Sequence, residues 1–214
     1  MRRVSLPTMT GSLCVAIFVL AVCGGTARAV MLIDADTRNG SFETGQWSPW
    51  SVSDDALVND ASFASRGSWY AKLETTTGRE LTFQTLSINK NDGTVFLMQA
   101  DVRNGVNPFD TIQLSIYGQT YSGQFVNATL NLFEIPAAAA NTWVTLSATA
   151  EFAPAAWQAL NPAKIWVNVQ FTENQPGSAL HRGFLDNITL RQVPEPTALT
   201  ILTLGMFAIA AKRR

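Results

Sequence analysis

Apolar and polar residues alternate in short runs along most of this 214-residue chain. In the clearest run, Ile165, Val167, Val169 and Phe171 fall on one parity, and Trp166, Asn168 and Gln170 fall on the other. Similar alternation recurs in three further runs, 68–74, 94–103 and 111–117. A period of two is that of a β-strand with one buried face. The pattern therefore predicts a chain of β-strands from about residue 33 to residue 190.

Turn-forming dipeptides such as Asn104-Gly105 and Pro176-Gly177 separate the runs. Only two short patches, 136–141 and 155–160, resemble helices, and no strand–helix–strand rhythm, internal repeat or linker divides the sequence. This organisation predicts one all-β domain over residues 30–192, a β-sandwich or jelly roll of about eight to ten antiparallel strands.

Two strands carry finer predictions. In 81–88 the apolar parity changes after Phe83, which predicts a β-bulge near Gln84. In the last strand Asp186 has the parity of Phe184, Ile188 and Leu190, so we expect its carboxylate to point toward the apolar side.

The N-terminus has the three parts of a secretory signal peptide. It opens with Arg2 and Arg3, continues with an apolar run at 13–22, and ends with the small residues Ala27 and Ala29. We therefore expect residues 1–29 to be a signal peptide that signal peptidase removes after Ala29. A short membrane anchor is the alternative, although a span needs about 20 apolar residues.

Processing at Ala29 would change both the cysteine content and the charge of the chain. Both cysteines, Cys14 and Cys23, precede Ala29, so the mature chain would have no disulfide and no thiolate metal site. Residues 30–192 hold 9 basic and 15 acidic residues, a net charge of about −6. An acidic body without a run of Lys or Arg argues against nucleic acid as a partner.

The C-terminus also has three parts: Val193-Pro194-Glu195-Pro196, an apolar stretch at 198–211, and Lys212-Arg213-Arg214. The prolines interrupt regular structure. A helix over the apolar stretch would be about 21 Å long, shorter than the roughly 30 Å hydrocarbon core of a bilayer. We expect a short transmembrane helix with its cations on the cytoplasmic side and the body outside.

This tail resembles the PEP-CTERM sorting signal through Val193, Pro194, Glu195 and Pro196, followed by the apolar stretch and the basic end at Arg213 and Arg214. The resemblance makes residues 193–214 a temporary stop in the inner membrane, cut by an exosortase-type transpeptidase. It implies an envelope, cell-surface or extracellular-matrix protein of a Gram-negative bacterium that makes extracellular polysaccharide. An ordinary tail anchor is the alternative.

Four motifs follow one another along the body: Asn39-Gly40-Ser41-Phe42-Glu43, Gly67 to Leu73, Phe83-Gln84, and Leu185-Asp186-Asn187-Ile188. In this order they resemble the jelly-roll carbohydrate-binding modules of the galactose-binding-like superfamily, and the resemblance implies a jelly-roll β-sandwich. In these modules a structural calcium ion often bridges the first and last strands.

Glu43 and Asp186 are the candidate calcium ligands. An inward carboxylate at Asp186 needs a partner, and the fold would bring the start of the first strand, with Glu43, beside the last strand. Two carboxylates with turn carbonyls form an oxygen shell suited to Ca²⁺. Alternatively, Asp186 caps backbone N–H groups or pairs with Arg66 or Arg182.

Catalysis is not expected. His181 is the only histidine, and no Gly-x-Ser-x-Gly nucleophile motif accompanies it. Asp54 and Asp55 are adjacent in a polar loop, with nothing nearby to raise the pKa of either for glycoside hydrolysis.

Outward aromatic side chains are the candidate ligand-binding residues, because aromatic rings stack on the apolar faces of sugars. The candidates are Tyr70, Trp166 and Tyr117 on strands, and Trp47 and Trp50 in a loop. Alternatively, Trp47, Trp50 and Trp143 cap the sandwich ends, and Tyr70 and Trp166 cover the second sheet. The sequence thus favours a non-catalytic exported protein that binds extracellular polysaccharide. The alternatives are a structural or adhesive matrix protein without a sugar site, or a glycan hydrolase.

Overall fold

The computed structural model describes residues 29–34, 37–52, 56–76, 79–105, 107–128, 131–134, 141–172 and 179–194. Residues 29–195 form one compact unit. Residues 1–28 and 195–214, which hold most of the predicted signal peptide and sorting tail, lie outside the described residues. Within the described ranges, no helix has the length and apolar character needed to cross a membrane.

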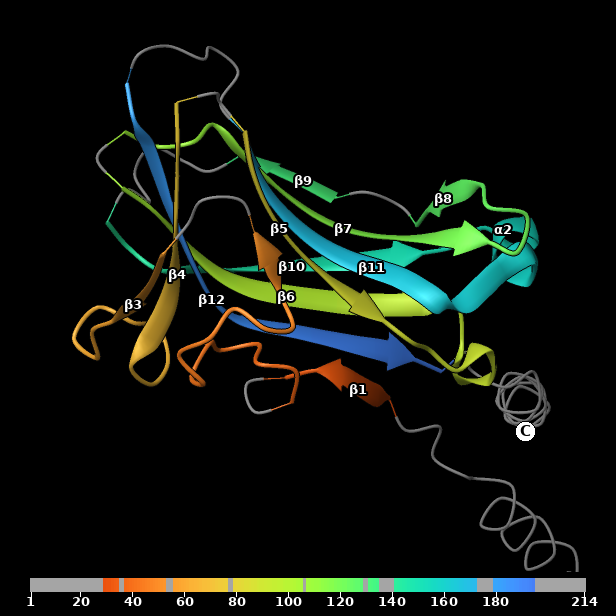
Figure 1. Ribbon diagram of the computed structural model, residues 1–214. Helices are drawn as coiled ribbons and strands as arrows, with labels where there is room; N and C mark the ends of the chain where they lie inside the picture. Colours follow the sequence, from red (N-terminus) through yellow and green to blue (C-terminus); the bar gives the residue numbers. More distant parts are fainter. Residues whose placement is uncertain are drawn as a thin grey trace, which may run out of the picture. The chain divides into compact units, whose positions relative to one another are not determined.

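Two antiparallel sheets face each other (Figure 1). Sheet A has the order β10 (Val144–Glu151), β6 (Val95–Asn104), β12 (His181–Val193), β4 (Trp69–Thr75) and β3 (Ala56–Asn59), with β1 (Val30–Ile33) also paired to β12. Sheet B has the order β2 (Ser51–Val52), β5 (Arg79–Leu86), β11 (Leu160–Thr172), β7 (Thr111–Thr120) and β8 (Phe125–Asn127), with β9 (Asn131–Glu134) also paired to β7. A 3₁₀ helix, η1 (Lys90–Asp92), and one α-helix, α2 (Pro154–Ala159), complete the described elements.

The predicted all-β sandwich is confirmed. The described ranges contain twelve strands, more than the expected eight to ten, because strands as short as β2 and β8 are too brief for alternation to reveal. Helix α2 lies where the patch at 155–160 was predicted. The patch at 136–141 lies outside the described residues except for Asn141.

The core lies between the inner faces of the two sheets. Ile165, Val167, Val169 and Phe171 of β11 are fully buried, as their parity predicted. Phe96, Met98, Ala100 and Val102 of β6 oppose them from sheet A in the same core cluster. The period-two alternation of these long strands therefore determines which residues form the core.

Strand β5 contradicts the predicted bulge at Gln84. Its pairing with β11 runs in unbroken register from Arg79 to Leu86. Gln84 is 1% exposed and shares its face with buried Leu86, and its amide donates to the carbonyl of Arg38 at 3.1 Å. A buried amide, rather than an extra residue, accounts for the change of apolar parity.

The bulge lies in β12 instead. Its register with β6 shifts between Asp186 and Thr189, and Asn187 has a positive φ of 48°. Leu185 therefore points into the core, whereas Phe184 and Asp186 point to the outer face of sheet A. The prediction that Asp186 shares a face with Ile188 and Leu190 was wrong, because the bulge reverses the parity between them.

Gly183 tests the packing between the sheets. A Cβ atom at this position would lie 2.7 Å from the Phe171 ring and 3.2 Å from the Phe109 ring. We expect Gly183→Ala to lower the free energy of unfolding by about 1–3 kcal/mol through overpacking. Urea denaturation measures the change, and Ser122→Ala in the exposed β7–β8 turn is the control. Equal stabilities of the two variants would contradict the described packing.

Candidate functional site

Three aromatic side chains gather on the outer face of sheet B. Trp166 of β11 lies directly across from Tyr117 of β7, and their rings are nearly parallel, 13° apart in plane with centroids at 5.5 Å. Phe125 of β8 packs against both, at 5.8 Å from Trp166 and 6.3 Å from Tyr117. This aromatic triad is held by the backbone register of three adjacent strands, so its geometry is built into the sheet.

The triad is partly open to solvent. Phe125 is 65% exposed, and Trp166 and Tyr117 are half-buried. The Tyr117 hydroxyl is protonated at physiological pH and can donate a hydrogen bond, and burial raises its pKa still further. The site therefore combines apolar ring surface with one polar donor.

Polar side chains continue the same face beside the triad. Asn168 and Gln170 follow Trp166 on the same face of β11, two and four residues further along the strand. Asn168 lies across from Ser115, and Gln170 lies across from Gln113. Among the described residues, the Oδ1 atom of Asn168 is buried and has no hydrogen-bond partner. On the other side of the triad, the Lys164 ammonium donates to Gln119 Oε1 at 3.0 Å. The face can thus offer amide and hydroxyl groups next to aromatic surface.

A shallow pocket of about 440 Å³ also borders this region. It is lined by Asn127, Ala128, Glu151, Phe152, Ala153 and Pro154. Asn127 is the β8 residue paired with Tyr117, two residues after Phe125, so the pocket begins on a strand that carries the triad.

Tyr70 does not belong to this site. It points to the outer face of sheet A, as its parity predicted, but it is only 6% exposed. Phe63, Trp143 and Phe184 surround it, with ring centroids 4.8–6.3 Å away. The Arg103 guanidinium covers the Phe63 ring at 3.8 Å. The prediction that Tyr70 offers a ring to a ligand was wrong, because the 60–68 loop covers it.

Trp47 and Trp50 pack into the sandwich. Trp50 is 4% exposed, and its indole N–H donates to the carbonyl of Asn39 at 3.1 Å. Trp47 is half-buried with its ring edge-to-face against Phe42 at 5.6 Å. These contacts contradict the use of Trp50 as an open platform and support the alternative that both tryptophans cap the core.

Sequence reasoning found Trp166 and Tyr117 but missed Phe125. The strand β8 has only three residues, too few for a period of two to stand out. The available signal was a hairpin: a turn with Gly123 at positive φ joins β7 to Phe125. A hairpin at this turn would have placed Phe125 beside the end of β7.

Glu43 and Asp186 meet at one loop, residues 65–69. The Asp186 carboxylate accepts from the backbone N–H groups of Arg66 at 2.9 Å and Asn187 at 2.6 Å. Glu43 Oε1 accepts from the N–H groups of Ser68 at 2.9 Å and Trp69 at 2.8 Å. The predicted convergence of the two carboxylates is present, and the alternative that Asp186 caps backbone N–H groups is confirmed.

Gly67 allows this loop to form. It has a φ of +70°, which favours glycine, and a Cβ atom here would lie 2.4 Å from the Glu43 carboxyl carbon. No set of three or more His, Cys, Asp or Glu residues suited to a metal occurs within the described ranges.

Asp186 is fully buried, and desolvation raises its pKa to about 7, with a further contribution from the charge of nearby Asp101. The hydrogen bonds from backbone N–H groups oppose this shift but do not cancel it. Asp101 itself is bound by the hydroxyl groups of Ser65 and Thr145 and by the amide of Asn187. The two carboxylates, paired across β12 and β6, therefore form a buried polar network under the loop.

The other residues that were considered for catalysis are His181, Asp54 and Asp55. His181 is 9% exposed, and its Nδ1 atom lies 3.2 Å from the carbonyl oxygen of Pro108, with its ring beside Phe109. Asp54 and Asp55 lie outside the described residues.

Comparison with known proteins defines the tail and the fold. Residues 192–214 match the PEP-CTERM protein-sorting motif, which confirms the resemblance drawn from Val193 to Pro196 and the basic end. Such signals mark proteins for export and sorting to the surface of Gram-negative bacteria, and the motif implies processing by an exosortase. No curated protein matches the chain.

Solved structures similar to the body include carbohydrate-binding modules. The CBM22-1 xylan-binding domain of Paenibacillus barcinonensis Xyn10C has 12% identity and a TM-score of 0.52, covering 78% of this chain and 97% of that domain. A carbohydrate-binding module of the β-sandwich superfamily has 16% identity and a TM-score of 0.52, covering 72% of this chain and 62% of that one.

Part of an enzyme chain is similar to the body as well. The enzymatically active domain of bacteriophage CBA120 tailspike protein 4 has 19% identity and a TM-score of 0.51 over 71% of this chain. This chain covers only 20% of that tailspike chain. At such identities the likeness establishes the sandwich fold alone.

Stability of the metal-free protein should depend on pH through Asp186. Its folded-state pKa of about 7 exceeds the ordinary 3.8, so the folded chain holds a proton that the unfolded chain has lost between these values. The resulting stabilisation is fully present below pH 4 and is lost as the pH rises through about 7, at most about 4 kcal/mol in total.

The variant Asp186→Asn isolates this contribution. We expect the melting temperature of the wild type in chelator to rise relative to that of Asp186→Asn as the pH falls from 8 to 5. Comparing the two proteins cancels the opposite effect of Glu74, whose pKa is lowered by hydrogen bonds and charges from Lys72 and Arg182 despite partial desolvation. Parallel pH profiles of wild type and variant would show that Asp186 ionises normally.

Proposed function

We propose that this protein is exported, sorted to the cell surface, and binds polysaccharide through the outer face of sheet B without catalysing a reaction. The aromatic triad of Trp166, Tyr117 and Phe125 carries the proposal. Its rings lie on the open face of a sheet, where a pyranose ring can place its apolar C–H face against them. The PEP-CTERM tail supports the surface location.

The chemistry beside the triad fits sugar hydroxyl groups. Asn168 and Gln170 carry amides that can both donate and accept, and Ser115 adds a hydroxyl between the strands. The unsatisfied Oδ1 atom of Asn168 gains a partner if a hydroxyl group or a bridging water reaches it. Aromatic surface next to such groups matches a ligand with alternating apolar and hydroxyl faces.

The contacts of Glu43, Asp186 and His181 support a binding role rather than hydrolysis for these three side chains. Glu43 and Asp186 use their carboxylates on backbone N–H groups of the 65–69 loop. His181 contacts a backbone carbonyl and lies against Phe109. None of these three side chains belongs to the strands that carry the triad.

Removing Trp166 should abolish most of the binding. We expect Trp166→Ala to weaken association with the producing bacterium's purified extracellular polysaccharide at least tenfold, about 1.4 kcal/mol or more, because a central aromatic anchor is lost. Affinity electrophoresis or calorimetry on the processed protein measures the change, with soluble xylan as a defined second probe.

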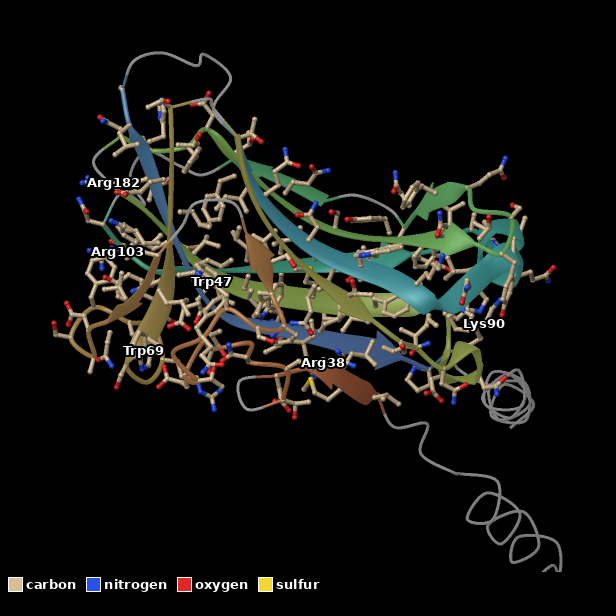
Figure 2. All side chains as sticks on the ribbon, in the orientation of Figure 1. Arg38, Trp47, Trp69, Lys90, Arg103 and Arg182 are labelled. Carbon is tan, nitrogen blue, oxygen red and sulfur yellow. The ribbon has the colours of Figure 1, made fainter. Side chains whose placement is uncertain are left out.

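Trp69→Ala is the matched control, because Trp69 is also a half-buried tryptophan but lies on β4 of sheet A. Figure 2 shows Trp69 near β3 and β4. Melting curves of both variants establish that each is folded. Equal losses of affinity in both variants, or none in Trp166→Ala, would contradict the proposed face.

Calcium at Glu43 and Asp186 remains a second proposal. Both carboxylates converge on the 65–69 loop, which suits a bridging ion, but each already accepts N–H groups that an ion would have to replace. A bound ion would keep Asp186 ionised and tie the loop to β12.

We expect Ca²⁺ to raise the melting temperature, chelator to reverse the rise, and Asp186→Ala to lower stability and remove the response. A melting curve that neither calcium nor chelator moves would leave backbone capping as the whole role of these carboxylates.

A further inference from the structure

The last residues of β12 are held in the body by backbone pairing and by side-chain hydrogen bonds. Gln192 is fully buried and pairs on both sides, with Phe96 of β6 and with Val30 of β1. Its side-chain amide donates to the carbonyl groups of Asn89 at 2.9 Å and Gly93 at 2.7 Å. The side chain thereby holds the η1 segment at this end of the sandwich.

The sorting motif overlaps this strand. The match to the motif begins at Gln192, whereas β12 continues through Val193, which pairs with Val95 of β6. Pro194 is the first residue beyond the strand. The sequence-based boundary after residue 192 therefore falls inside β12, and no spacer separates the sheet from the Pro-Glu-Pro tripeptide.

The N-terminal junction lies at the same end of sheet A. Strand β1 begins at Val30, one residue after the predicted signal-peptidase site, and Val30 is the partner of Gln192. Figure 1 shows β1 and the end of β12 beside each other, and Figure 2 places Lys90 of η1 at this end, away from Arg103 and Arg182. The two predicted processing junctions are thus neighbours in one sheet.

We infer that the folded body and the sorting signal share β12, so that removal of the tail is limited by how readily the end of β12 separates from β6 and β1. This inference rests on the sorting part of the proposed function and is independent of carbohydrate binding. It makes Gln192 and Val193 residues that control access of the processing enzyme to the tail.

The physical reason is the form of substrate that a peptidase needs. In the cut, one peptide bond on the tail side of Val193 breaks, and the tail leaves with a new amino group. The body's carbonyl carbon takes the oxygen of water or the nitrogen of an amine acceptor. An active site must hold the chain on both sides of that bond, whereas Gln192 and Val193 already have their backbone groups paired in the sheet.

A spacer between Val193 and Pro194 tests the inference. Six Gly and Ser residues extend by about 20 Å, enough to move the tail away from the sheet without altering either part. In a Gram-negative host that contains an exosortase, we expect pulse–chase labelling to show severalfold faster tail removal from the spacer variant. The matched control carries the same insertion between Ser122 and Gly123, in the exposed β7–β8 turn, and should be processed at the wild-type rate.

Gln192→Ala provides the second variant. Loss of the bonds to Asn89 and Gly93 should loosen the end of β12, lower the melting temperature of the purified protein, and speed tail removal. Intact mass of the processed wild type should show a body that retains Val193.

Each outcome decides between the alternatives. Equal rates for wild type and spacer variant, or a mature body that lacks Gln192, would overturn the inference while leaving sorting intact. Retention of the tail by both the wild type and the spacer variant in this host would contradict the proposed sorting and the inference together. Loss of polysaccharide binding affects neither result, because processing is measured on the chain itself.

Discussion

The pairing of β12 on both sides is the constraint on which the rest of sheet A depends. This strand pairs with β6 along most of its length, with β4 over His181–Leu185 and with β1 at its end. The bulge at Asn187 divides it into two halves of opposite parity. One half sends Leu185 inward and Phe184 outward, and the other buries Ile188 and Leu190. The one extra residue therefore places Phe184 and Asp186 on the outer face, whereas Ile188 and Leu190, which have the same sequence parity, lie on the inner face.

The two outer faces of the sandwich differ because of what covers them. On sheet A, the 60–68 loop brings Phe63 against Tyr70 and Phe184, and its backbone is fixed by Glu43 and Asp186. On sheet B, Phe125 of the short strand β8 packs against Trp166 and Tyr117 and is itself 65% exposed. The same pattern of outward aromatics thus forms a closed cluster on one sheet and an open surface on the other.

Sequence periodicity predicted the fold class, the inner face of β11 and the positions of Trp166 and Tyr117, because each depends only on local alternation over a long strand. It could not predict the burial of Tyr70, since the covering residue Phe63 comes from a loop with no periodic pattern. It placed the bulge in β5 rather than β12. The burial of Gln84 and the positive φ of Asn187 both depend on the tertiary structure, which local alternation does not report. Phe125 was missed for a related reason, since three residues carry too little pattern.

Three buried polar side chains hold loop and turn segments against the two sheets. Gln84, Asp186 and Gln192 are each 2% exposed or less, and each holds a segment outside its own sheet pairing: the Arg38 turn, the Arg66 loop and the η1 helix. An apolar side chain at these positions could fill the space but could not bind the backbone of a loop. Gln192 is also the first residue of the matched sorting motif. Its hydrogen bonds to the η1 segment therefore couple the folded state of the sandwich to the removal of the tail.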